Sequence, residues 1–530
     1  MAIVVLIAAF TISKREPPPP TIAEFAPQAQ EQIREAPNEQ SFGEAGGPGD
    51  PRGEGGENPA FATEEEEAID VPRVRRCVGD PPRQTEDPQS PPCVPYWSGE
   101  NGGETSRGVT ANEIIVALPF VFFEDLGAIR DLANHVNKRY ELYGRKIVLK
   151  EYTPRGNISS HPNIEQEHAD AQQVDQEIGA FASLSTGLRW GQEHHYYDEL
   201  ARRKILSVAH GAGGQLTEER LKEFAPYQWA VLPGMDTMLR NYAEFVCNGL
   251  AKKPPRFAGA KEQLETERVF GLIYQRTTDG NTPDISPLED GLDRCGVTLK
   301  VKLEDNPSAD TGRNAGNLMI QMSGEGVTSI ICLCQCNDVR DHMMPASSGQ
   351  GYFPEWLLST YINNDVDNCH RTSPPDQSRS IIGLTFGNKH LLREDMPWYW
   401  ALKEVNSSYN PGEGSYYHLS ARYASLLLLA SGIQMAGPNL TPETFAAALQ
   451  KTRFPNPGAG LAPYYQARVG FEGGKHTMIG DAGMFWYDAA AQSAIEPSQV
   501  GAVCFVDLGL RYRLGRWPKE EPRFRQGPCY

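Results

Sequence analysis

Histidine and carboxylate side chains gather at Glu193, His194, His195 and Asp198. If this segment is helical, His194 and Asp198 lie one turn apart on the same face. Imidazole and carboxylate groups at that spacing could bind a metal ion. A solvated helix face is the more common reason for such a cluster, so we interpret it as polar surface and predict no metal site and no cofactor.

Three cysteines, Cys332, Cys334 and Cys336, alternate along a run of extended character. Alternation places all three side chains on one face of a strand, where thiols could bind a metal. Structural zinc sites usually take their ligands from paired C-x-x-C turns, which the sequence lacks. We therefore expect Cys332 and Cys334 to be small buried apolar residues, and Cys336 to lie where the strand ends and opens toward a cleft.

Motifs for nucleophilic, metal-dependent or phosphate chemistry are missing from the sequence. It contains no Gly-x-Ser-x-Gly elbow, no H-E-x-x-H and no G-x-x-x-x-G-K-[ST]. The Gly-rich stretch 211–214 follows an apolar run but lacks the full G-x-G-x-x-G spacing of a dinucleotide site. We predict that the protein is not an enzyme. An exported metal-dependent hydrolase that uses residues 193–198 is kept as an alternative.

Short apolar strands and amphipathic helices alternate along the chain after residue 107. The first round predicts strands at 113–119, 146–152 and 205–208, with helices that contain Leu126 to Val136 and Val174 to Ile178. After Pro233 the alternation restarts, with helices at 235–250, 288–295 and 318–322 and strands at 269–274, 297–303 and 329–334. This order indicates an α/β protein in which parallel sheets with right-handed crossovers form two lobes.

Composition separates a folded part from a long N-terminal linker. The chain has 530 residues, 39% of them hydrophobic, and a net charge of −18. Residues 16–75 hold fourteen acidic and four basic side chains and are rich in Pro and Gly, so we predict that residues 14–76 form a disordered acidic linker. An acidic chain without a basic stripe argues against a nucleic-acid partner.

The first residues are apolar. Residues 1–13 contain an apolar run of eleven residues, shorter than the roughly 20 that span a bilayer as a helix. The run could be the core of a secretory signal or the end of a truncated membrane anchor, and we favour the anchor. A long apolar pattern at Tyr416 to Met435 holds His418 and Arg422, so we expect a buried helix there and not a membrane span.

The chain contains ten cysteines. Cys77 and Cys93 flank a polar, Pro-rich loop within the segment 77–107, where free thiols would gain no packing, so we predict a disulfide between them. Further possible pairs are Cys247 with Cys295, Cys336 with Cys369, and Cys504 with Cys529 in the C-terminal tail 517–530. Disulfides indicate an oxidising, extracytoplasmic compartment.

The order of these elements resembles a known family. The stretches GVTANEIIVALPF, FASLSTG, KILSVAHGAGGQLT, ERVFGLIYQRTTDG, GYFPEWLLSTY and LTPETFAAAL follow one another between Gly108 and Leu449. In this order they resemble the type I periplasmic substrate-binding proteins, such as the branched-chain amino-acid receptors of ABC transporters. The resemblance covers about residues 108–508 and implies two Rossmann-like lobes, joined by three crossings, that close on a small ligand.

The resemblance also implies the lobe boundaries and the site. Lobe 1 would comprise 108–234 and 378–472 and lobe 2 would comprise 235–377 and 473–516, with crossings near 232–236, 377–380 and 470–476. Loops after the strands would contact the ligand through Phe120, Ser183, Ser185, Thr186, His210, Gly211 and Ala212 in lobe 1. The residues in lobe 2 would be Tyr274, Gln275, Asp279, Gln335 and Tyr361.

The sequence departs from amino-acid receptors at two of these positions. The loop that usually grips a carboxylate with Thr or Ser contains His210, and Tyr361 lies near the expected acid. We therefore expect a different ligand, such as an aromatic or polyol-like molecule or a carboxylate held by histidine. The resemblance implies an extracytoplasmic, membrane-tethered solute-binding protein that serves the permease of an ABC importer. A ligand-sensing receptor ectodomain is the alternative.

Overall fold

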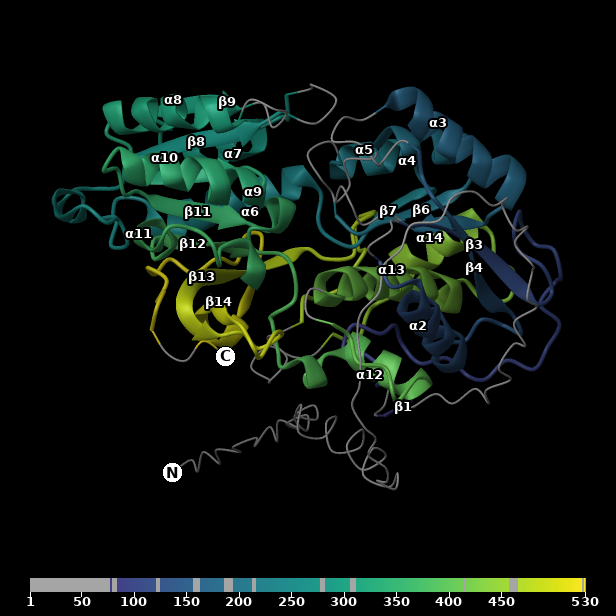
Figure 1. The fold of residues 1–530 in the computed structure, drawn as a ribbon. Helices are drawn as coiled ribbons and strands as arrows, with labels where there is room; N and C mark the ends of the chain where they lie inside the picture. Colours follow the sequence, from purple (N-terminus) through teal and green to yellow (C-terminus); the bar gives the residue numbers. More distant parts are fainter. Residues whose placement is uncertain are drawn as a thin grey trace, which may run out of the picture.

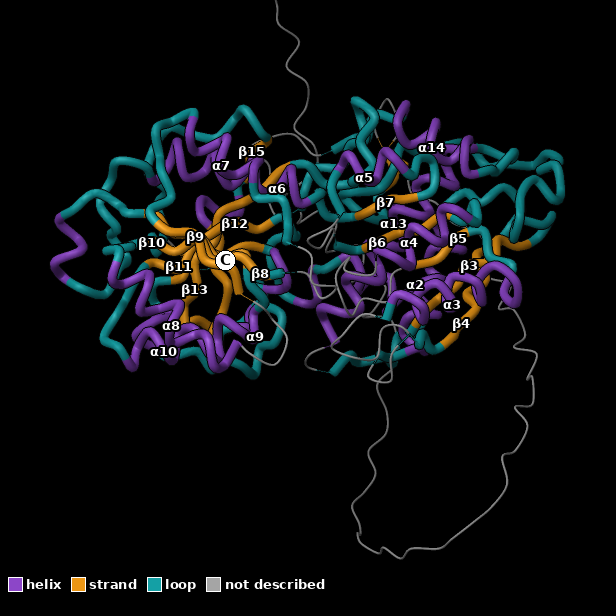
Figure 2. Tube along the Cα trace, turned by 90° about the horizontal axis from the view of Figure 1, so that it is seen from above, coloured by secondary structure: helices purple, strands orange, loops and turns teal. Residues whose placement is uncertain are grey.

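The structure is a computed structural model that describes residues 77–78, 83–120, 124–155, 163–184, 194–211, 216–276, 282–305, 311–412, 415–456, 466–526 and 529. The predicted anchor 1–13 and linker 14–76 lie outside these residues. Two α/β lobes stand side by side, each with a sheet between helices (Figures 1 and 2). The predicted fold class of two lobes with parallel sheets is confirmed.

The first lobe is built on a five-stranded sheet in the order β4-β3-β5-β6-β7, with every pair parallel. Its strands are β3 (Glu113–Pro119), β4 (Lys146–Tyr152), β5 (Ala182–Leu184), β6 (Leu206–Ala209) and β7 (Gln228–Ala230). The observed bounds of β3 and β4 equal the predicted ones. β3 lies inside the sheet and is an apolar run with five buried residues, as a strand covered on both faces requires. β4 is the edge strand, and its lysines and glutamate are only partly buried or exposed.

Helices cover both faces of this sheet. They are α2 (Leu126–Arg139), α3 (Ile164–Gln173) with the π-helix η1 (Val174–Ile178), α4 (His194–Arg202), α5 (Glu218–Glu223), α12 (Pro397–Val405) after the 3-10 helix η7 (Arg393–Asp395), α13 (Ser415–Ala436) and α14 (Pro442–Lys451). Asp125 caps α2 by accepting a hydrogen bond from the Ala128 backbone N–H at 3.0 Å. The leucines of α13, Leu426 to Leu429, are buried, as predicted. Across the described ranges, no helix combines the length and apolarity that crossing a membrane demands.

The second lobe is built on an eight-stranded sheet in the order β14-β13-β12-β11-β10-β8-β9, and β15 pairs with β13. Its strands are β8 (Phe270–Gln275), β9 (Val301–Asp305), β10 (Ser329–Leu333), β11 (Glu355–Ser359), β12 (Ile381–Thr385), β13 (Asp481–Gln492), β14 (Val500–Phe505) and β15 (Arg511–Arg513). The five strands from β8 to β12 run parallel, and the last three are antiparallel additions.

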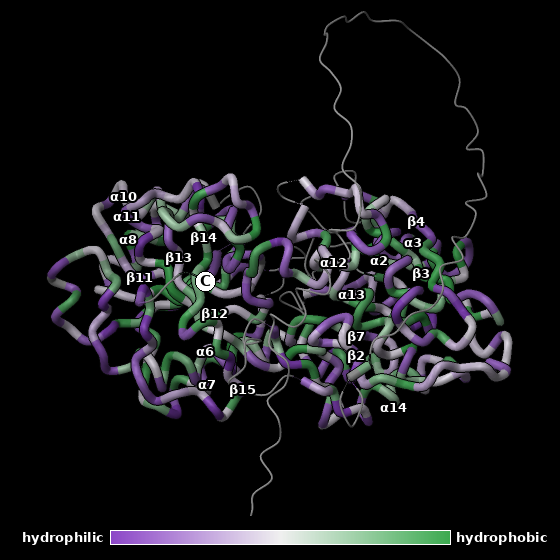
Figure 3. Tube along the Cα trace, turned by 90° about the horizontal axis from the view of Figure 1, so that it is seen from below, coloured by the Kyte–Doolittle hydropathy of each residue, from purple (hydrophilic) through white to green (hydrophobic). Residues whose placement is uncertain are grey.

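The helices of the second lobe flank this sheet. They are α6 (Met235–Phe245) with η2 (Val246–Leu250), η3 (Lys261–Glu265), α7 (Ser286–Asp293), α8 (Thr311–Gly324), α9 (Cys336–Asp338) with η4 (Val339–Met343), α10 (Met344–Gly349), η5 (Tyr361–Asn363), η6 (Asp367–Cys369), α11 (Pro375–Ser378) and η9 (Val506–Gly509). Hydrophobic segments run through the interior of both lobes, while polar loops lie outside (Figure 3).

Two of the predicted crossings between the lobes are misplaced. Strand β12 pairs with β11 and β13 in the second lobe, so the chain crosses after Thr385 and not at 377–380. Thr477 still bridges Ala230 in the first lobe, so the return crossing lies between Thr477 and Asp481 and not at 470–476. Apolar strands such as β12 look alike in either sheet, and only the pairing register assigns them to a lobe.

A segment before the first lobe, residues 83–107, is called the N-terminal strap here. It begins with β2 (Arg83–Gln84), which pairs with β1 (Cys77–Val78). The Gln84 amide donates to the Arg139 carbonyl at 3.0 Å, and Ser90 shares a hydrogen bond with the Tyr140 hydroxyl at 2.9 Å. The strap is therefore packed onto α2 of the first lobe.

The structure contains the four disulfides proposed from the sequence, which join Cys77 to Cys93, Cys247 to Cys295, Cys336 to Cys369, and Cys504 to Cys529. It also joins Cys332 to Cys334. These two residues are buried as predicted, but they are not free thiols. Sequence spacing did not reveal the bond because the strand ends at Leu333, which lets Cys334 turn toward Cys332.

Candidate functional site

A cavity of about 110 Å³ lies between the two lobes. The first lobe contributes residues that follow β6 and β7 and residues of α12 and α13, including His210, Leu232, Trp398, Tyr416, Tyr417 and Tyr423. The second lobe contributes residues that follow β11 and β12, including Thr360, Asn363, Asp365, Asn388 and His390. Because ligands of open α/β sheets bind at the carboxyl ends of the strands, this cavity is the candidate site.

Asp365 is fixed at the floor of the second lobe. The hydroxyls of Thr360 and Thr385 each donate to its Oδ2 at 2.6 Å. Thr360 also accepts a hydrogen bond from the Phe386 backbone N–H at 2.6 Å. The carboxylate is thus held at the ends of β11 and β12 in one orientation.

The N-terminal strap closes another side of the cavity with Asp87 and Gln89. The Gln89 backbone N–H donates to Asp87 Oδ1 at 2.6 Å, and the Gln89 amide donates to the Ala467 carbonyl at 2.7 Å. Burial raises the pKa of Asp87 to about 6. The strap therefore brings a buried carboxyl group to the cavity from outside the two lobes.

Aromatic side chains form the wall on the side of α12 and α13. The rings of Tyr416 and Tyr417 lie 5.0 Å apart, and those of Trp398 and Tyr416 lie 5.6 Å apart, both pairs edge to face. Burial raises the pKa of Tyr416, Tyr417 and Tyr423 above the ordinary value, so all three are neutral hydroxyls at physiological pH.

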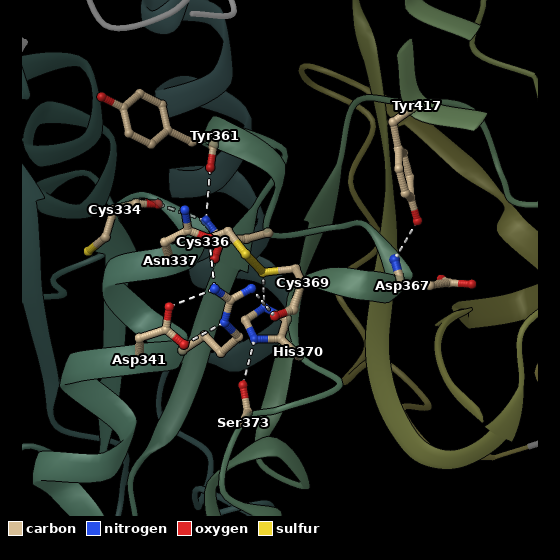
Figure 4. Close-up of a disulfide and its surroundings, with 12 residues drawn as sticks. Cys334, Cys336, Asn337, Asp341, Tyr361, Asp367, Cys369, His370, Ser373 and Tyr417 are labelled. Carbon is tan, nitrogen blue, oxygen red and sulfur yellow. Dashed lines mark hydrogen bonds and ion pairs between the residues drawn. A yellow bond between two sulfur atoms is a disulfide. The ribbon is translucent and has the colours of Figure 1, made fainter. Parts of the chain in front are cut away.

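A buried His–Asp pair supports this wall. His390, which lines the cavity, hydrogen-bonds through Nδ1 to Asp367 Oδ1 at 2.9 Å. Asp367 also accepts from Ser493 at 2.7 Å and from the Val503 backbone N–H at 2.8 Å. Its own backbone N–H donates to the Tyr417 hydroxyl at 2.8 Å, close to the Cys336–Cys369 disulfide (Figure 4).

Some residues that line the cavity carry a buried polar atom with no hydrogen-bond partner within the described part of the chain. Among these atoms are the indole Nε1 of Trp398 and the amide Oε1 of Gln466. Buried polar groups are normally paired, so each unsatisfied group in a native protein points to a ligand or water that completes it. The cavity therefore offers a donor and an acceptor to a bound molecule.

His210 is the one predicted ligand residue that the described structure places on the cavity wall. Burial, together with the nearby charge of Arg422, lowers the pKa of His210 to about 3, so its imidazole is neutral. Arg422 itself donates to Glu124 at 2.8 Å and to the Pro119 carbonyl at 2.8 Å. Its charge is therefore paired with the carboxylate of Glu124.

The other described candidates lie elsewhere. Ser183 shares a hydrogen bond with the Tyr196 hydroxyl at 2.6 Å inside the first lobe. Gln275 donates to Asp305 at 2.9 Å and accepts from the Gln335 backbone N–H at 2.6 Å, which links β8, β9 and α9. The remaining four are not on the wall of the cavity: Phe120, Gly211, Tyr274 and Tyr361. Ser185, Thr186, Ala212 and Asp279 lie outside the described residues.

Sequence reasoning missed the strap and the tyrosines of α13. Tyr416, Ser420 and Tyr423 follow a spacing of four and three residues, which places them on one helix face toward the cavity. That spacing could have been recognised in the sequence. The leucines of the same helix instead led us to interpret the whole helix as buried core. Asp87 carried no signal, because no periodicity connects the strap to the lobes.

The cluster at 193–198 is not the polar surface that we predicted. Glu193 lies outside the described residues, while His194 and Asp198 are buried on α4. Asp198 pairs with Arg220 and accepts from the Gln228 amide at 2.9 Å. Helix α4 packs against α3, which covers the face that sequence alone left open to solvent. Among the described residues, no group of three or more His, Cys, Asp or Glu could hold a metal ion.

Comparisons with known proteins give matches only among solved structures. No family model matches the sequence, and no curated protein matches it. A solute-binding protein of an ABC transporter from Rhodopseudomonas palustris BisB5, in complex with 3,4-dihydroxybenzoic acid, is 9% identical with a TM-score of 0.52, over 76% of this chain and 98% of the other. A leucine-, isoleucine-, valine-, threonine- and alanine-binding protein from Brucella ovis, in its closed conformation, is 12% identical with a TM-score of 0.52, over 78% of this chain and 100% of the other.

Proposed function

The chain has the fold of the type I periplasmic binding proteins, and we propose that it is an extracytoplasmic solute-binding protein for an ABC importer. It captures a small organic ligand between its lobes and delivers it to a membrane permease. The observation that carries this proposal is the cavity between the lobes, walled by the carboxyl-end loops of β6 and β7 on one side and of β11 and β12 on the other. The similar solute-binding protein from Rhodopseudomonas palustris BisB5 is likewise in complex with a small organic molecule, 3,4-dihydroxybenzoic acid.

The proposed mechanism involves binding and closure without chemistry. A ligand that contacts both lobes stabilises the closed arrangement over the open one, and only this difference in affinity drives closure. Asp365 supplies a fixed contact on the second lobe, and Trp398 supplies an unsatisfied N–H on the first. One molecule can engage both only when the lobes are together.

The proposal extends to location and attachment. Five disulfides in the structure suit an oxidising compartment outside the cytoplasm. Residues 1–13 would anchor the protein, and the acidic linker 14–76 would let the lobes reach a permease in the same membrane.

A thermal-shift screen of the full chain tests the proposal. The screen covers amino acids, organic acids, aromatic acids, sugars and amines. A ligand at 100 times its dissociation constant adds about 2.7 kcal/mol of stability, enough to raise the melting temperature by a few degrees. We expect one chemical class to shift the transition. A folded, ligand-free protein that no class stabilises would contradict the proposal.

A further inference from the structure

The charge of the cavity wall is negative. Two carboxyl groups, Asp87 and Asp365, line the cavity, and the lining residues that the structure describes include no Lys or Arg. His210 adds no positive charge, because its imidazole is neutral at physiological pH. His390, the other histidine of the wall, is paired at 2.9 Å with the buried carboxylate of Asp367, which balances its charge. A carboxylate ligand would therefore meet repulsion here, whereas a cation would meet two opposite charges.

Asp87 has a position that packing alone does not explain. Only 3% of the surface of Asp87 is exposed. Within the described residues its carboxyl group meets the Gln89 backbone N–H and the Tyr423 hydroxyl but no opposite charge. Burying a carboxyl group costs free energy unless an opposite charge or several hydrogen bonds compensate it. A protein retains such a group at a cavity when a bound ligand supplies the compensation.

The aromatic wall also favours a positively charged ligand. Tyr416, Tyr417 and Trp398 line the cavity opposite the second lobe. Aromatic rings attract cations through their quadrupole, and the attraction grows when the cation is shielded from water. The unsatisfied Gln466 Oε1 additionally accepts hydrogen bonds, which a protonated amine donates.

We propose that the ligand is a small organic amine, whose cationic nitrogen lies between the carboxylates of Asp87 and Asp365 and against the tyrosine wall. This inference rests on the proposed function and names the class of its solute. The strap then acts as a third wall of the site, because it brings one of the two carboxylates. Trp398 Nε1 provides a donor for a hydroxyl or carbonyl oxygen elsewhere on the amine.

Matched ligands of different charge test the inference on the full chain. Calorimetry compares tyramine, tyrosol and 4-hydroxyphenylacetate, which share a phenol and differ in carrying an amine, a hydroxyl or a carboxylate. Benzylamine, ethanolamine, choline and putrescine extend the amine arm, with leucine and 4-hydroxybenzoate as further comparators. We expect at least one amine to bind and its neutral or anionic counterpart to bind at least tenfold more weakly.

Variants identify the carboxylate responsible. Asp87→Asn should weaken the binding of that amine by about thirtyfold or more, because a buried charge loses its partner. Glu86→Gln makes the same charge change one residue away on the strap, off the cavity wall, and should alter affinity by less than about threefold. Equal affinity of wild type and Asp87→Asn would overturn the role of the strap.

Two negative results separate the inference from the proposed function. If neutral or anionic compounds bind and no amine does, the amine inference is wrong and the solute-binding function stands. If compounds of every class fail to bind to the folded protein, both the amine inference and the solute-binding function are wrong.

Discussion

Asp367 and His390 form a buried pair in which the imidazole Nδ1 lies 2.9 Å from the carboxylate Oδ1. The pair joins η6, which directly follows the cavity-lining residues after β11, to the loop after β12, which also lines the cavity. Burial alone would raise the pKa of Asp367, but the charge of His390 and the hydrogen bonds from His390, Val503 and Ser493 lower it below its ordinary value. The ionised carboxylate therefore stabilises the folded protein.

Replacing Asp367 with Asn should destabilise the protein by about 3–5 kcal/mol at pH 7, because His390 loses its buried charged partner. The stabilisation is present above the pKa of Asp367 in the unfolded chain and is lost as the pH falls through its lower folded-state pKa. The deficit of the variant should thus shrink at acidic pH. Urea denaturation at pH 7 and pH 3 measures this deficit, with Asp290→Asn, at an exposed position of α7, as the control. A constant deficit at both pH values would contradict this assignment.

Replacing Asp87 with Asn should stabilise the ligand-free protein, whereas Asp367→Asn destabilises it. Because the pKa of Asp87 is raised to about 6, the folded state holds its proton more tightly than the unfolded chain. Wild-type stability therefore falls as the pH rises from about 4 to about 6, and it stays lowered above that range. We expect Asp87→Asn to stabilise the protein by about 2 kcal/mol at pH 8 and by little at pH 4. A variant that is less stable than wild type at pH 8 would contradict the prediction.

Gly432 sets the distance between α13 and α14. A Cβ at this position would lie 2.0 Å from the Phe445 ring, so the helices can approach this closely only because residue 432 is glycine. Gly432→Ala should therefore destabilise the protein by about 1–3 kcal/mol through overpacking. Gly349→Ala is the control, because an added Cβ meets nothing within 4 Å there. Chemical denaturation compares the two variants, and equal stabilities would contradict the packing argument.

The Cys336–Cys369 disulfide ties α9 to η6 beside the cavity (Figure 4). Replacing both cysteines with Ser should lower stability by about 2–4 kcal/mol, because the cross-link no longer restricts the unfolded chain. Denaturation of the double variant under oxidising conditions measures the loss. Wild type treated with reductant is the comparison. A double variant as stable as oxidised wild type would show that the disulfide does not contribute to stability.

The sequence was sufficient to predict the fold but not the site. Local sequence patterns predicted β3 and β4 with their observed bounds, because the extended character of a short strand can be read from its own residues. Which lobe contains β12 is decided by its pairing with β11 and β13. No local sequence pattern reveals that pairing. The cavity unites Asp87, Asp365 and Tyr416 from three separate segments, so only the assembled lobes place them together.

The central claim is that one ligand engages both lobes, and calorimetry on two variants tests it most directly. Trp398→Phe removes an N–H from the first lobe and keeps the aromatic packing, while Asp365→Asn removes a charge from the second lobe. The account predicts that each variant, shown to be folded, binds the screened ligand at least about tenfold more weakly than wild type. Unchanged affinity in either variant would show that the ligand contacts only one lobe and would contradict closure around it.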